Sequence, residues 1–418
     1  MKVVIIGGDA AGMSAASRAK RNNPDLDVTV LEKTTDVSYS ACGMPYNIAD
    51  PERNIEDLVV RKAQVFREKQ NINLLTGHCV ESIDPANRTV SGTSFQGKAF
   101  KFSYDKLLIA TGASPIIPDL SGFDLPGVVA LKSLDDGRKI KAYIQSNNVN
   151  KVVIIGMGYI ALEMCEALGA LSIDVDMVKP RPIFLPWMDN EMSEVVRKEL
   201  ETHRIKLYLG QAIEKIVSEK GQLRVLCSDS VLEADMVLVA IGIKPNSELA
   251  IRSGLEFGIN NAISVDKNLK TSDENIYAAG DCADAYHVVT GEKTWIPLAL
   301  RANRAGWAAA DNICGKAVAL TGVAGTAVFK VFDLEVARTG LTVDEASAYG
   351  FAPAEVVIKT RSRAHAHPGA SFIHVQMVGD TKSGRLLGAQ MVGKEGVAHR
   401  INAPAVALHS RMTVEEYC

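Results

Sequence analysis

The clearest hydrophobic pattern in the chain is a short continuous apolar run that occurs twice. Residues 2–6 read Lys-Val-Val-Ile-Ile before Gly7, and residues 151–155 repeat these letters before Gly156. Continuous runs of β-branched residues are typical of parallel strands that are buried on both faces. Each run leads into glycines and then into an alanine-rich stretch suited to a helix. The pattern predicts two βαβ units, an arrangement that binds dinucleotides.

The loop of the first unit is rich in glycine and reads Gly7-Gly8-Asp9-Ala10-Ala11-Gly12. Glycines let the backbone approach a pyrophosphate, which then lies at the N-terminus of the helix predicted to begin near Ala10. The next strand, residues 27–31, is followed by Glu32, where a carboxylate can accept hydrogen bonds from a ribose diol. A strand-to-helix turn without a ligand would not need this acid, so Glu32 favours a dinucleotide site.

The loop of the second unit reads Gly156-Met157-Gly158-Tyr159-Ile160-Ala161. Its second strand, residues 173–178, is followed by Lys179 and Arg181 in place of an acid. Cations attract a ribose 2′-phosphate and a carboxylate would repel it. We therefore predict that this site prefers NADPH to NADH, although both cations could also be solvated loop charges.

Three further apolar strands run into glycine. Residues 107–112 end in Ala110-Thr111-Gly112, and residues 237–242 end in Gly242. We expect each of these two segments to close one nucleotide-binding unit. Residues 275–281 end in Gly280-Asp281, where an aspartate can bind the polyol of a flavin.

The pattern changes from about residue 322 to antiparallel strands with polar turns. Residues 326–332, 352–358 and 372–378 read as strands, and Gly379-Asp380 reads as a turn. We predict an α/β protein with two nested Rossmann-like domains and a separate C-terminal α+β domain. The predicted boundaries are 1–115 with 245–321 for the first domain, 116–244 for the second and 322–418 for the third.

Composition narrows the possible partners and the compartment. The formal charge of −3 gives no support for a nucleic-acid partner. No apolar run reaches the ~20 residues that span a bilayer, and we see no signal peptide, so we expect a cytoplasmic protein without a membrane partner. The seven cysteines are scattered and lack zinc-type spacing, which fits a reducing compartment and predicts no metal site.

The candidate redox group is a single thiol in the segment Ser38-Tyr39-Ser40-Ala41-Cys42-Gly43-Met44-Pro45. No second cysteine lies nearby in the sequence, so no internal dithiol pair is expected. A lone redox cysteine has to exchange electrons with a small thiol, a persulfide or a peroxide. The alternative is a buried structural cysteine.

Taken together, these motifs resemble the flavin-dependent pyridine nucleotide-disulfide oxidoreductases along essentially the whole chain. Within that family the chain looks most like the single-cysteine branch, which includes coenzyme A disulfide reductase, persulfide and sulfur reductases, and NADH oxidases. The resemblance implies FAD in the first domain, NADPH (or NADH) in the second and a homodimer formed by the third, the dimerisation domain. The cofactor-binding residues that it implies are Gly7, Gly8, Ala10, Ala11, Gly12, Glu32, Lys33, Val80, Ala110, Thr111, Gly112, Gly156, Gly158, Tyr159, Ile160, Glu163, Lys179, Arg181, Gly242, Gly280 and Asp281.

The resemblance also implies a mechanism and a substrate. Tyr159 and Glu163 would lie near the nicotinamide, and the Cys42 thiolate would attack a disulfide or persulfide sulfur, for which a lowered thiol pKa would help. The residues that match the coenzyme A site of the family are Ser14, Arg18, Arg21, Ser38, Lys69 and Asn303. Cations there suit the phosphates of coenzyme A, but a basic helix end also complements its own dipole.

Three departures from the family affect the chemistry. The peroxidase relatives have a histidine at the position of Ala10, so peroxide cleavage is disfavoured here. A Tyr-Tyr-Pro-Gly element of the coenzyme A enzymes is replaced by residues 366–369, in which His367 is either the catalytic proton donor or an ordinary surface histidine. The family usually continues into a tail with a tyrosine, whereas this chain stops at Cys418, so we expect either a truncated chain or a proton donor elsewhere.

The sequence therefore predicts an NADPH-dependent flavoenzyme that reduces coenzyme A disulfide, coenzyme A persulfide or polysulfide through Cys42. One alternative is an NAD(P)H oxidase that reduces oxygen, with Cys42 cycling through sulfenic acid. Another is a redox-sensing or electron-transfer flavoprotein.

Overall fold

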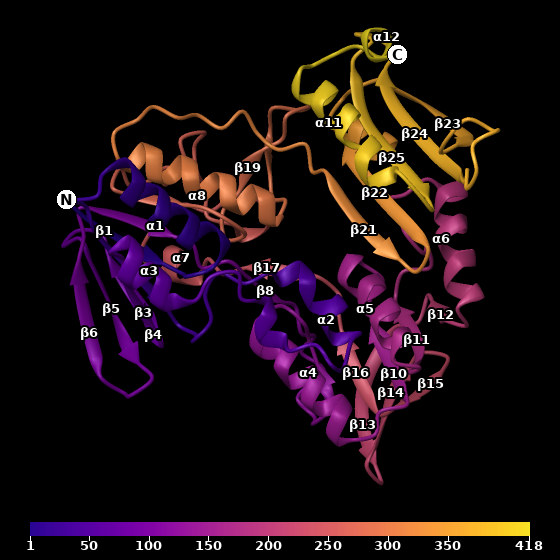
Figure 1. Cartoon of the computed structure of the whole chain (residues 1–418), viewed down its shortest axis with the longest axis horizontal. Coiled ribbons are helices and arrows are strands. Elements are labelled where there is room, and N and C mark those ends of the chain that lie inside the picture. Colours follow the sequence, from indigo (N-terminus) through magenta and orange to yellow (C-terminus); the bar gives the residue numbers. More distant parts are fainter.

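A parallel five-stranded sheet forms the core of the first part of the computed structural model, which describes all residues 1–418 (Figure 1). From one edge to the other, its strands are β18 (Ile276–Ala278), β7 (Lys106–Ile109), β1 (Lys2–Ile6), β2 (Asp27–Glu32) and β3 (Asn73–Thr76). Ile6 pairs with Leu31 on one side and with Ile109 on the other. This register places the carboxyl ends of the central strands at one edge of the sheet, where the glycine loop begins.

Two long helices made largely of small residues, α1 (Ala10–Asn22) and α8 (Ala299–Ile313), pack together in this first part of the structure. The other helices of this part are α3 (Ala63–Gln70) and α7 (Glu248–Arg252). The helices α1 and α8 pack along each other, because Gly306 brings α8 so close that a β-carbon there would lie 2.2 Å from the Ala11 carbonyl oxygen. Short antiparallel strands complete this part: β4 (His78–Asp84), β5 (Thr89–Ser94), β6 (Ala99–Ser103), β19 (Ala285–Tyr286) and β20 (Lys293–Thr294).

The second parallel sheet repeats the arrangement of the first. Its strands, in spatial order, are β12 (Lys206–Leu209), β11 (Asp174–Lys179), β10 (Lys151–Ile155), β16 (Met236–Val239) and β9 (Val128–Val129). The helices around it are α2 (Met44–Ile48), α4 (Leu134–Ser146), α5 (Tyr159–Ala170) and α6 (Asn190–Thr202), and an antiparallel sheet is formed by β13 (Ile213–Glu219), β14 (Gln222–Cys227) and β15 (Val231–Ala234).

The chain passes between the two sheets through one antiparallel pair, β8 (Ala113–Pro115) and β17 (Ile243–Pro245). Because β18 pairs with β7 after this crossing, the chain returns to the first sheet. The predicted α/β fold with nested units is confirmed, while the predicted domain boundaries stay a prediction.

The C-terminal part is an antiparallel sheet with helices, as predicted. In spatial order it contains β21 (Ala327–Val331), β22 (Leu334–Gly340), β25 (Leu386–Gly393), β24 (Phe372–Asp380) and β23 (Pro353–Arg361), with α9 (Val343–Ala348), α10 (Val397–Arg400), α11 (Asn402–His409) and α12 (Val414–Tyr417). The turn expected at Gly379-Asp380 is wrong, because β24 continues through Asp380 and the turn occupies residues 381–383.

The packing core of the second sheet extends into two other parts of the chain. Met44 and Ile48 of α2 are buried in it, although they come from the sequence of the first unit. Phe329 and Val331 of the C-terminal sheet are buried in the same cluster. The segment that carries Cys42 is therefore anchored on the second nucleotide-binding unit. None of the helices combines the length and apolar character that crossing a bilayer requires.

Candidate functional site

The first glycine loop holds α1 tightly against the end of β1. Gly7 has a φ of +108°, and a β-carbon there would lie 2.2 Å from the Ala110 carbonyl oxygen. A β-carbon on Gly12 would lie 1.9 Å from the Gly7 carbonyl oxygen. Only glycine fits at these two points, so the loop has the close backbone approach that a dinucleotide pyrophosphate requires.

Glu32 closes this loop from the end of β2. Its carboxylate is buried and accepts hydrogen bonds from the Gly8 N–H at 2.7 Å and the Thr34 N–H at 2.7 Å. The Thr34 hydroxyl donates a third bond at 2.8 Å. The acid is thus fixed beside the glycines, as the predicted ribose contact requires.

Three charged side chains gather around the start of α1. Burial raises the pKa of Asp9 to about 6, while the Lys132 ammonium opposes this rise. Lys132 donates to the Asp281 carboxylate at 3.0 Å. Asp9 is therefore mostly ionised at pH 7 and takes up a proton only as pH falls through about 6, while the Lys132 ammonium offsets part of its negative charge. Lys132 was not predicted, because no motif marks it in the sequence.

The remaining residues predicted for the first unit differ in how close they lie to this loop. The Thr111 hydroxyl donates to the Asn246 carbonyl, and Gly112 has a φ of +72° with open space around it. Gly280 has a φ of +88°, and its β-carbon would approach Ala11 at 3.0 Å. Lys33 is exposed beyond Glu32, and Val80 packs from β4 against the core of the first sheet. Val80 therefore contributes to the packing of this core, and its predicted contact with the cofactor stays a prediction.

The second glycine loop has a backbone conformation similar to that of the first at its first glycine, but more open space around its second glycine. Gly156 has a φ of +117°, and a β-carbon there would lie 2.2 Å from the Ala240 carbonyl oxygen. Around Gly158, in contrast, no atom lies within 4 Å of the position that a β-carbon would take. This open space next to the first turn of α5, where Ile160 is 39% exposed, fits a second dinucleotide. Gly242 closes the unit with a φ of +134°.

The two predicted cations of the second unit are in different situations. The Lys179 ammonium donates to the Phe184 carbonyl oxygen at 2.7 Å, and burial followed by the nearby Arg181 lowers its pKa. Arg181 is exposed. Arg181 is therefore the cation that is available to an incoming phosphate.

Tyr159 and Glu163 occupy successive turns of α5 and face different neighbours. The Tyr159 ring packs against Phe329 of the C-terminal sheet, with a centroid distance of 4.9 Å. Glu163 accepts a hydrogen bond from the Tyr46 hydroxyl at 3.2 Å, which connects α5 to α2. Burial raises the pKa of Glu163 to about 7, against the lowering effect of the Tyr46 bond.

This raised pKa predicts a pH-dependent stability. Glu163 binds its proton more tightly in the folded chain, with a pKa of about 7 against an ordinary 4.5, so its stabilising contribution is full below pH 4.5 and is lost as pH rises through about 7. Glu163→Gln stays neutral at all pH values and should lose less stability over this window than the wild type. Thermal unfolding across the window measures this, and equal losses in the two proteins would contradict it.

Cys42 lies in a single 3₁₀ turn, Ala41–Gly43, that leads directly into α2. It is exposed, and all seven cysteines of the chain are free. Partial burial raises the pKa of its thiol, the Glu163 carboxylate adds to the rise, and Lys132 opposes it. Glu163 and Lys132 belong to the second unit and Asp281, which also raises the pKa, belongs to the first, so the thiol lies between groups of both units. A lowered thiol pKa would favour the thiolate form of Cys42, but these protein groups together raise that pKa.

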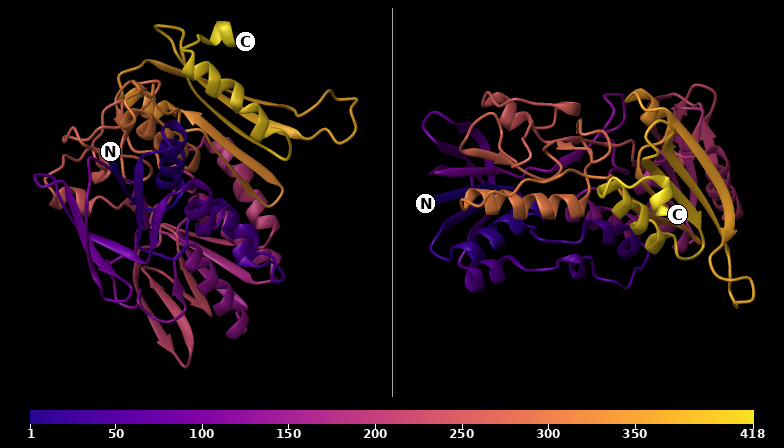
Figure 2. Two further views of the ribbon diagram at one scale, coloured as in Figure 1. Left: turned by 60° about the vertical axis from the view of Figure 1, so that its left-hand side comes forward. Right: turned by 90° about the horizontal axis from the view of Figure 1, so that it is seen from above.

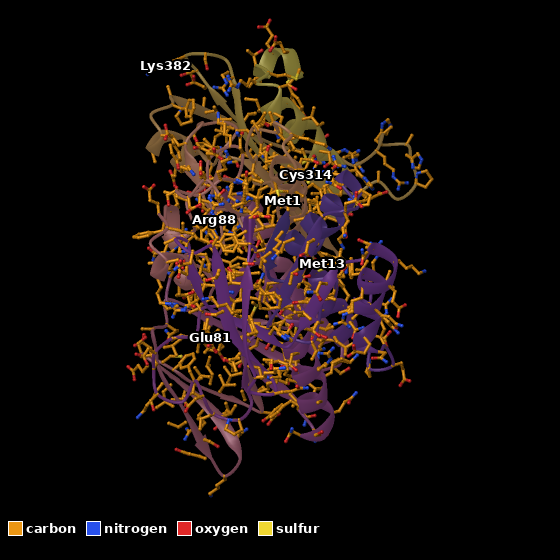
Figure 3. All side chains as sticks on the ribbon, turned by 90° about the vertical axis from the view of Figure 1, so that its left-hand side faces the viewer. Met1, Met13, Glu81, Arg88, Cys314 and Lys382 are labelled. Atoms are coloured by element: carbon orange, nitrogen blue, oxygen red, sulfur yellow. The ribbon has the colours of Figure 1, made fainter.

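The predicted substrate residues fall into two groups. The Ser14 hydroxyl donates to the Asn303 side-chain oxygen at 2.7 Å, across the contact of α1 with α8 (Figure 3, where the labels mark Met13 in α1 and Cys314 directly after α8). In the same contact between α1 and α8, which we call the α1–α8 seam, Arg18 donates to both carboxylate oxygens of Asp311, at 2.8 and 2.9 Å. The chain brings these residues together.

The other predicted substrate and catalytic residues make none of the hydrogen bonds between α1 and α8. Arg21 and Lys69 are exposed, and Ser38 has a left-handed φ of +51° four residues before Cys42. His367 lies in the loop between β23 and β24, which projects away from the rest of the chain (Figure 2), and its Nδ1 lies 2.9 Å from the Pro368 carbonyl oxygen. Within one chain, His367 and Cys42 are therefore not brought together.

The chain is similar to known proteins over nearly its whole length. Residues 1–306 match the pyridine nucleotide-disulphide oxidoreductase domain, and residues 326–418 match the dimerisation domain of the same family. The chain belongs to the pyridine nucleotide-disulphide oxidoreductase family. It is therefore an oxidoreductase, and FAD and a pyridine nucleotide are its cofactors.

Three relatives in this family cover nearly all of the chain. An NAD(P)H sulfur oxidoreductase (CoA-dependent) from Pyrococcus furiosus is 39% identical and is matched over 99% of this chain and 93% of its own. An NADH oxidase from Methanocaldococcus jannaschii is 36% identical, over 100% of this chain and 93% of its own. The solved structure of an NAD-dependent persulfide reductase from A. fulgidus superposes with a TM-score of 0.96 at 37% identity, over 100% of this chain and 78% of its own.

Proposed function

We propose that this chain uses NADPH and FAD to reduce coenzyme A disulfide, coenzyme A persulfide or polysulfide through Cys42. The observation that carries the proposal is one exposed thiol, whose charged neighbours are Glu163 and Lys132 of the second unit and Asp281 of the first. No second thiol contacts it within the chain, so we propose a diffusible sulfur compound as its exchange partner.

The chemistry proposed for Cys42 is a thiol–disulfide exchange. Its thiolate attacks one sulfur of the substrate, a Cys42–sulfur bond forms, and the substrate sulfur–sulfur bond breaks to release a thiolate that takes up one proton. When bound, FAD and NADPH would supply one hydride, whose two electrons are consumed in breaking the Cys42–sulfur bond and releasing the second thiol product. Glu163, whose pKa of about 7 lies near neutrality, is suited to hold or release a proton beside Cys42.

The residues proposed to hold the cofactors follow from the two loops. Gly7, Gly12 and Glu32 would hold the pyrophosphate and ribose of FAD, and Asp281 its polyol. Gly156 and Gly158 would hold the pyrophosphate of NADPH. The close backbone contacts at Gly7, Gly12 and Gly156, and the open space at Gly158, support this assignment.

The proposed coenzyme A site is the seam between α1 and α8. Ser14, Asn303 and Arg18 supply hydrogen-bonding groups there, with the charge of Arg18 paired with Asp311. Arg21 and Lys69 supply exposed positive charges. A relative that is 39% identical is named as CoA-dependent, which supports coenzyme A as part of the substrate.

A homodimer is proposed on the basis of the dimerisation domain. The hairpin of β23 and β24 exposes the apolar side chains of Val356, Ile358 and Phe372, each about half exposed at 54%, 49% and 50%, which suits burial against a second copy. In such a dimer the projecting loop would carry His367 away from its own chain, and His367 is our candidate proton donor to the leaving thiolate.

The mass of whatever is attached to Cys42 in the isolated protein tests this proposal. A coenzyme A adduct or a persulfide is the expected finding. Sulfenic acid, together with oxygen consumption faster than the reduction of any disulfide or persulfide, would instead favour an NAD(P)H oxidase, the second candidate, which the relative named NADH oxidase supports.

The coenzyme preference gives a further prediction. Arg181→Glu should lower kcat/KM for NADPH by about tenfold or more, because it replaces a charge-assisted contact with the 2′-phosphate by repulsion. The value for NADH should change by less than about threefold. Steady-state kinetics with both coenzymes measure this, and Lys198→Gln on the exposed face of α6 is the control. A higher kcat/KM for NADH in the wild type would contradict the NADPH assignment.

A further inference from the structure

One side of α4 is turned toward residues 36–56, the segment that carries Cys42. Arg138 on this side binds two carboxylates at once. Its Nη1 and Nη2 donate to Asp36 at 2.7 and 2.8 Å, and its Nε and Nη2 donate to Glu56 at 2.7 and 3.0 Å. Asp36 precedes Cys42 in the chain and Glu56 follows it, so one guanidinium joins both ends of the Cys42 segment.

Lys141, one turn further along α4, holds the middle of the same segment. Its ammonium donates to the Asn47 carbonyl at 2.9 Å and to the Asn47 side-chain oxygen at 3.0 Å. It also donates to the carbonyl oxygens of Asp50 at 2.9 Å and Arg53 at 2.6 Å. All of these acceptors lie at the C-terminal end of α2 or within five residues after it, and α2 begins two residues after Cys42.

Apolar packing brings α4 and the segment equally close. A β-carbon on Gly137 of α4 would approach Ile55 at 3.1 Å and the Met44 sulfur at 3.5 Å. Met44 and Ile48 are buried in the core of the second sheet, and α2 lies beside α4 and α5 (Figure 1). The segment is therefore attached to the second unit by both its polar and its apolar side chains.

Arg138 and Lys141 are both paired with oxygen atoms of the protein itself. The groove between α4 and residues 51–55 is lined by Arg53, Arg138 and Lys141, which would suggest an anion site. However, Arg138 is neutralised by two carboxylates and the Lys141 ammonium is surrounded by four oxygens. The groove is thus the line of contact between two parts of the chain, and the cations act on the segment.

We propose that Arg138 and Lys141 are positioning residues that fix Cys42 relative to the second nucleotide-binding unit. The inference rests on the proposed redox role of Cys42 and extends it to a helix more than 90 residues further along the chain. Because the Cys42 turn is continuous with α2, releasing either cation contact lets the thiol move away from its neighbours. Misplacement of a reacting atom by about 1 Å can cost on the order of 100-fold in rate.

The test compares Arg138→Gln and Lys141→Met with Lys139→Gln in the full-length, FAD-loaded protein. Lys139 lies on the exposed side of the same helix, paired with Asp135. One readout is the rate at which iodoacetamide alkylates Cys42, measured by peptide mass spectrometry relative to the exposed Cys79. The other readouts are kcat and KM for disulfide reduction and the rate of flavin reduction by NADPH.

Arg138→Gln and Lys141→Met should each raise the alkylation of Cys42 relative to Cys79 by about threefold or more, because a loosened segment gives the thiol more solvent and a lower pKa. They should lower kcat for disulfide reduction by roughly 10- to 100-fold with little change in KM or in flavin reduction. Lys141→Arg should restore part of both effects, and Lys139→Gln should show neither.

Unchanged Cys42 alkylation in a folded variant overturns the inference, whether or not turnover falls, and so does an equal rise at Cys79. If Arg138→Gln fails to fold, Glu56→Gln releases one side of the same contact at an exposed residue and is judged by the same readouts. If Cys42→Ser retains turnover, the proposed function fails, but Cys42 alkylation still decides whether α4 positions the thiol.

Discussion

Replacing Cys42 with serine is expected to abolish the reduction of coenzyme A disulfide and persulfide, with a loss on the order of 1000-fold or more. A serine hydroxyl is a much weaker nucleophile at neutral pH than a thiol, and its oxygen cannot form the sulfur–sulfur bond that the exchange requires. Cys165, Cys227 and Cys282 cannot substitute for it, since they are buried in the cores of the two units. Anaerobic steady-state assays with each sulfur substrate measure the loss.

Flavin reduction provides the internal check on this variant. NADPH should still bleach the flavin absorbance of Cys42→Ser, because the residues that we assign to the two cofactors are untouched. Cys79→Ser, which removes an exposed thiol on β4, should keep full activity. Undiminished disulfide and persulfide reduction by Cys42→Ser would end the proposal that this thiol is the redox centre.

The parallel sheets could be predicted from the sequence because their strands are buried on both faces. Residues 2–6 and 151–155 form β1 and β10 over the predicted ranges, and their apolar runs are unbroken. The strands β4 and β15 have mixed or alternating exposure, so they lack such a run. The buried strand β25 was missed because its run includes Gly388 and Gln390, which interrupt an apolar pattern.

The candidate site could be predicted only where a motif marks it. Glu32 and Cys42 belong to local patterns, and the structure places each next to the predicted elements. Lys132 was missed because its partner Asp281 lies 149 residues away in the chain. Lys139 and Lys141 look equivalent in the sequence of α4, and only tertiary contacts separate a solvated cation from one that holds the Cys42 segment.

Gly12→Ala is expected to cost the chain its FAD and much of its stability. A β-carbon at residue 12 would lie 1.9 Å from the Gly7 carbonyl oxygen, so α1 has to move away from the end of β1. Overpacking a rigid contact of this kind costs about 3 kcal/mol or more of the free energy of unfolding. The same displacement withdraws the helix N-terminus from the pyrophosphate. The FAD content per chain and denaturant unfolding measure both losses.

Gly158→Ala is the matched comparison, because the second glycine loop has room where the first has none. No atom lies within 4 Å of the added β-carbon, and the φ of −87° at residue 158 suits any residue. We expect the free energy of unfolding to stay within about 0.5 kcal/mol of the wild type and FAD to remain bound. The new methyl group stands where the second pyrophosphate has to approach, so KM for NADPH should rise by about tenfold. Full FAD content in Gly12→Ala, or loss of FAD in Gly158→Ala, would contradict the assignment of FAD to the first glycine loop and NADPH to the second.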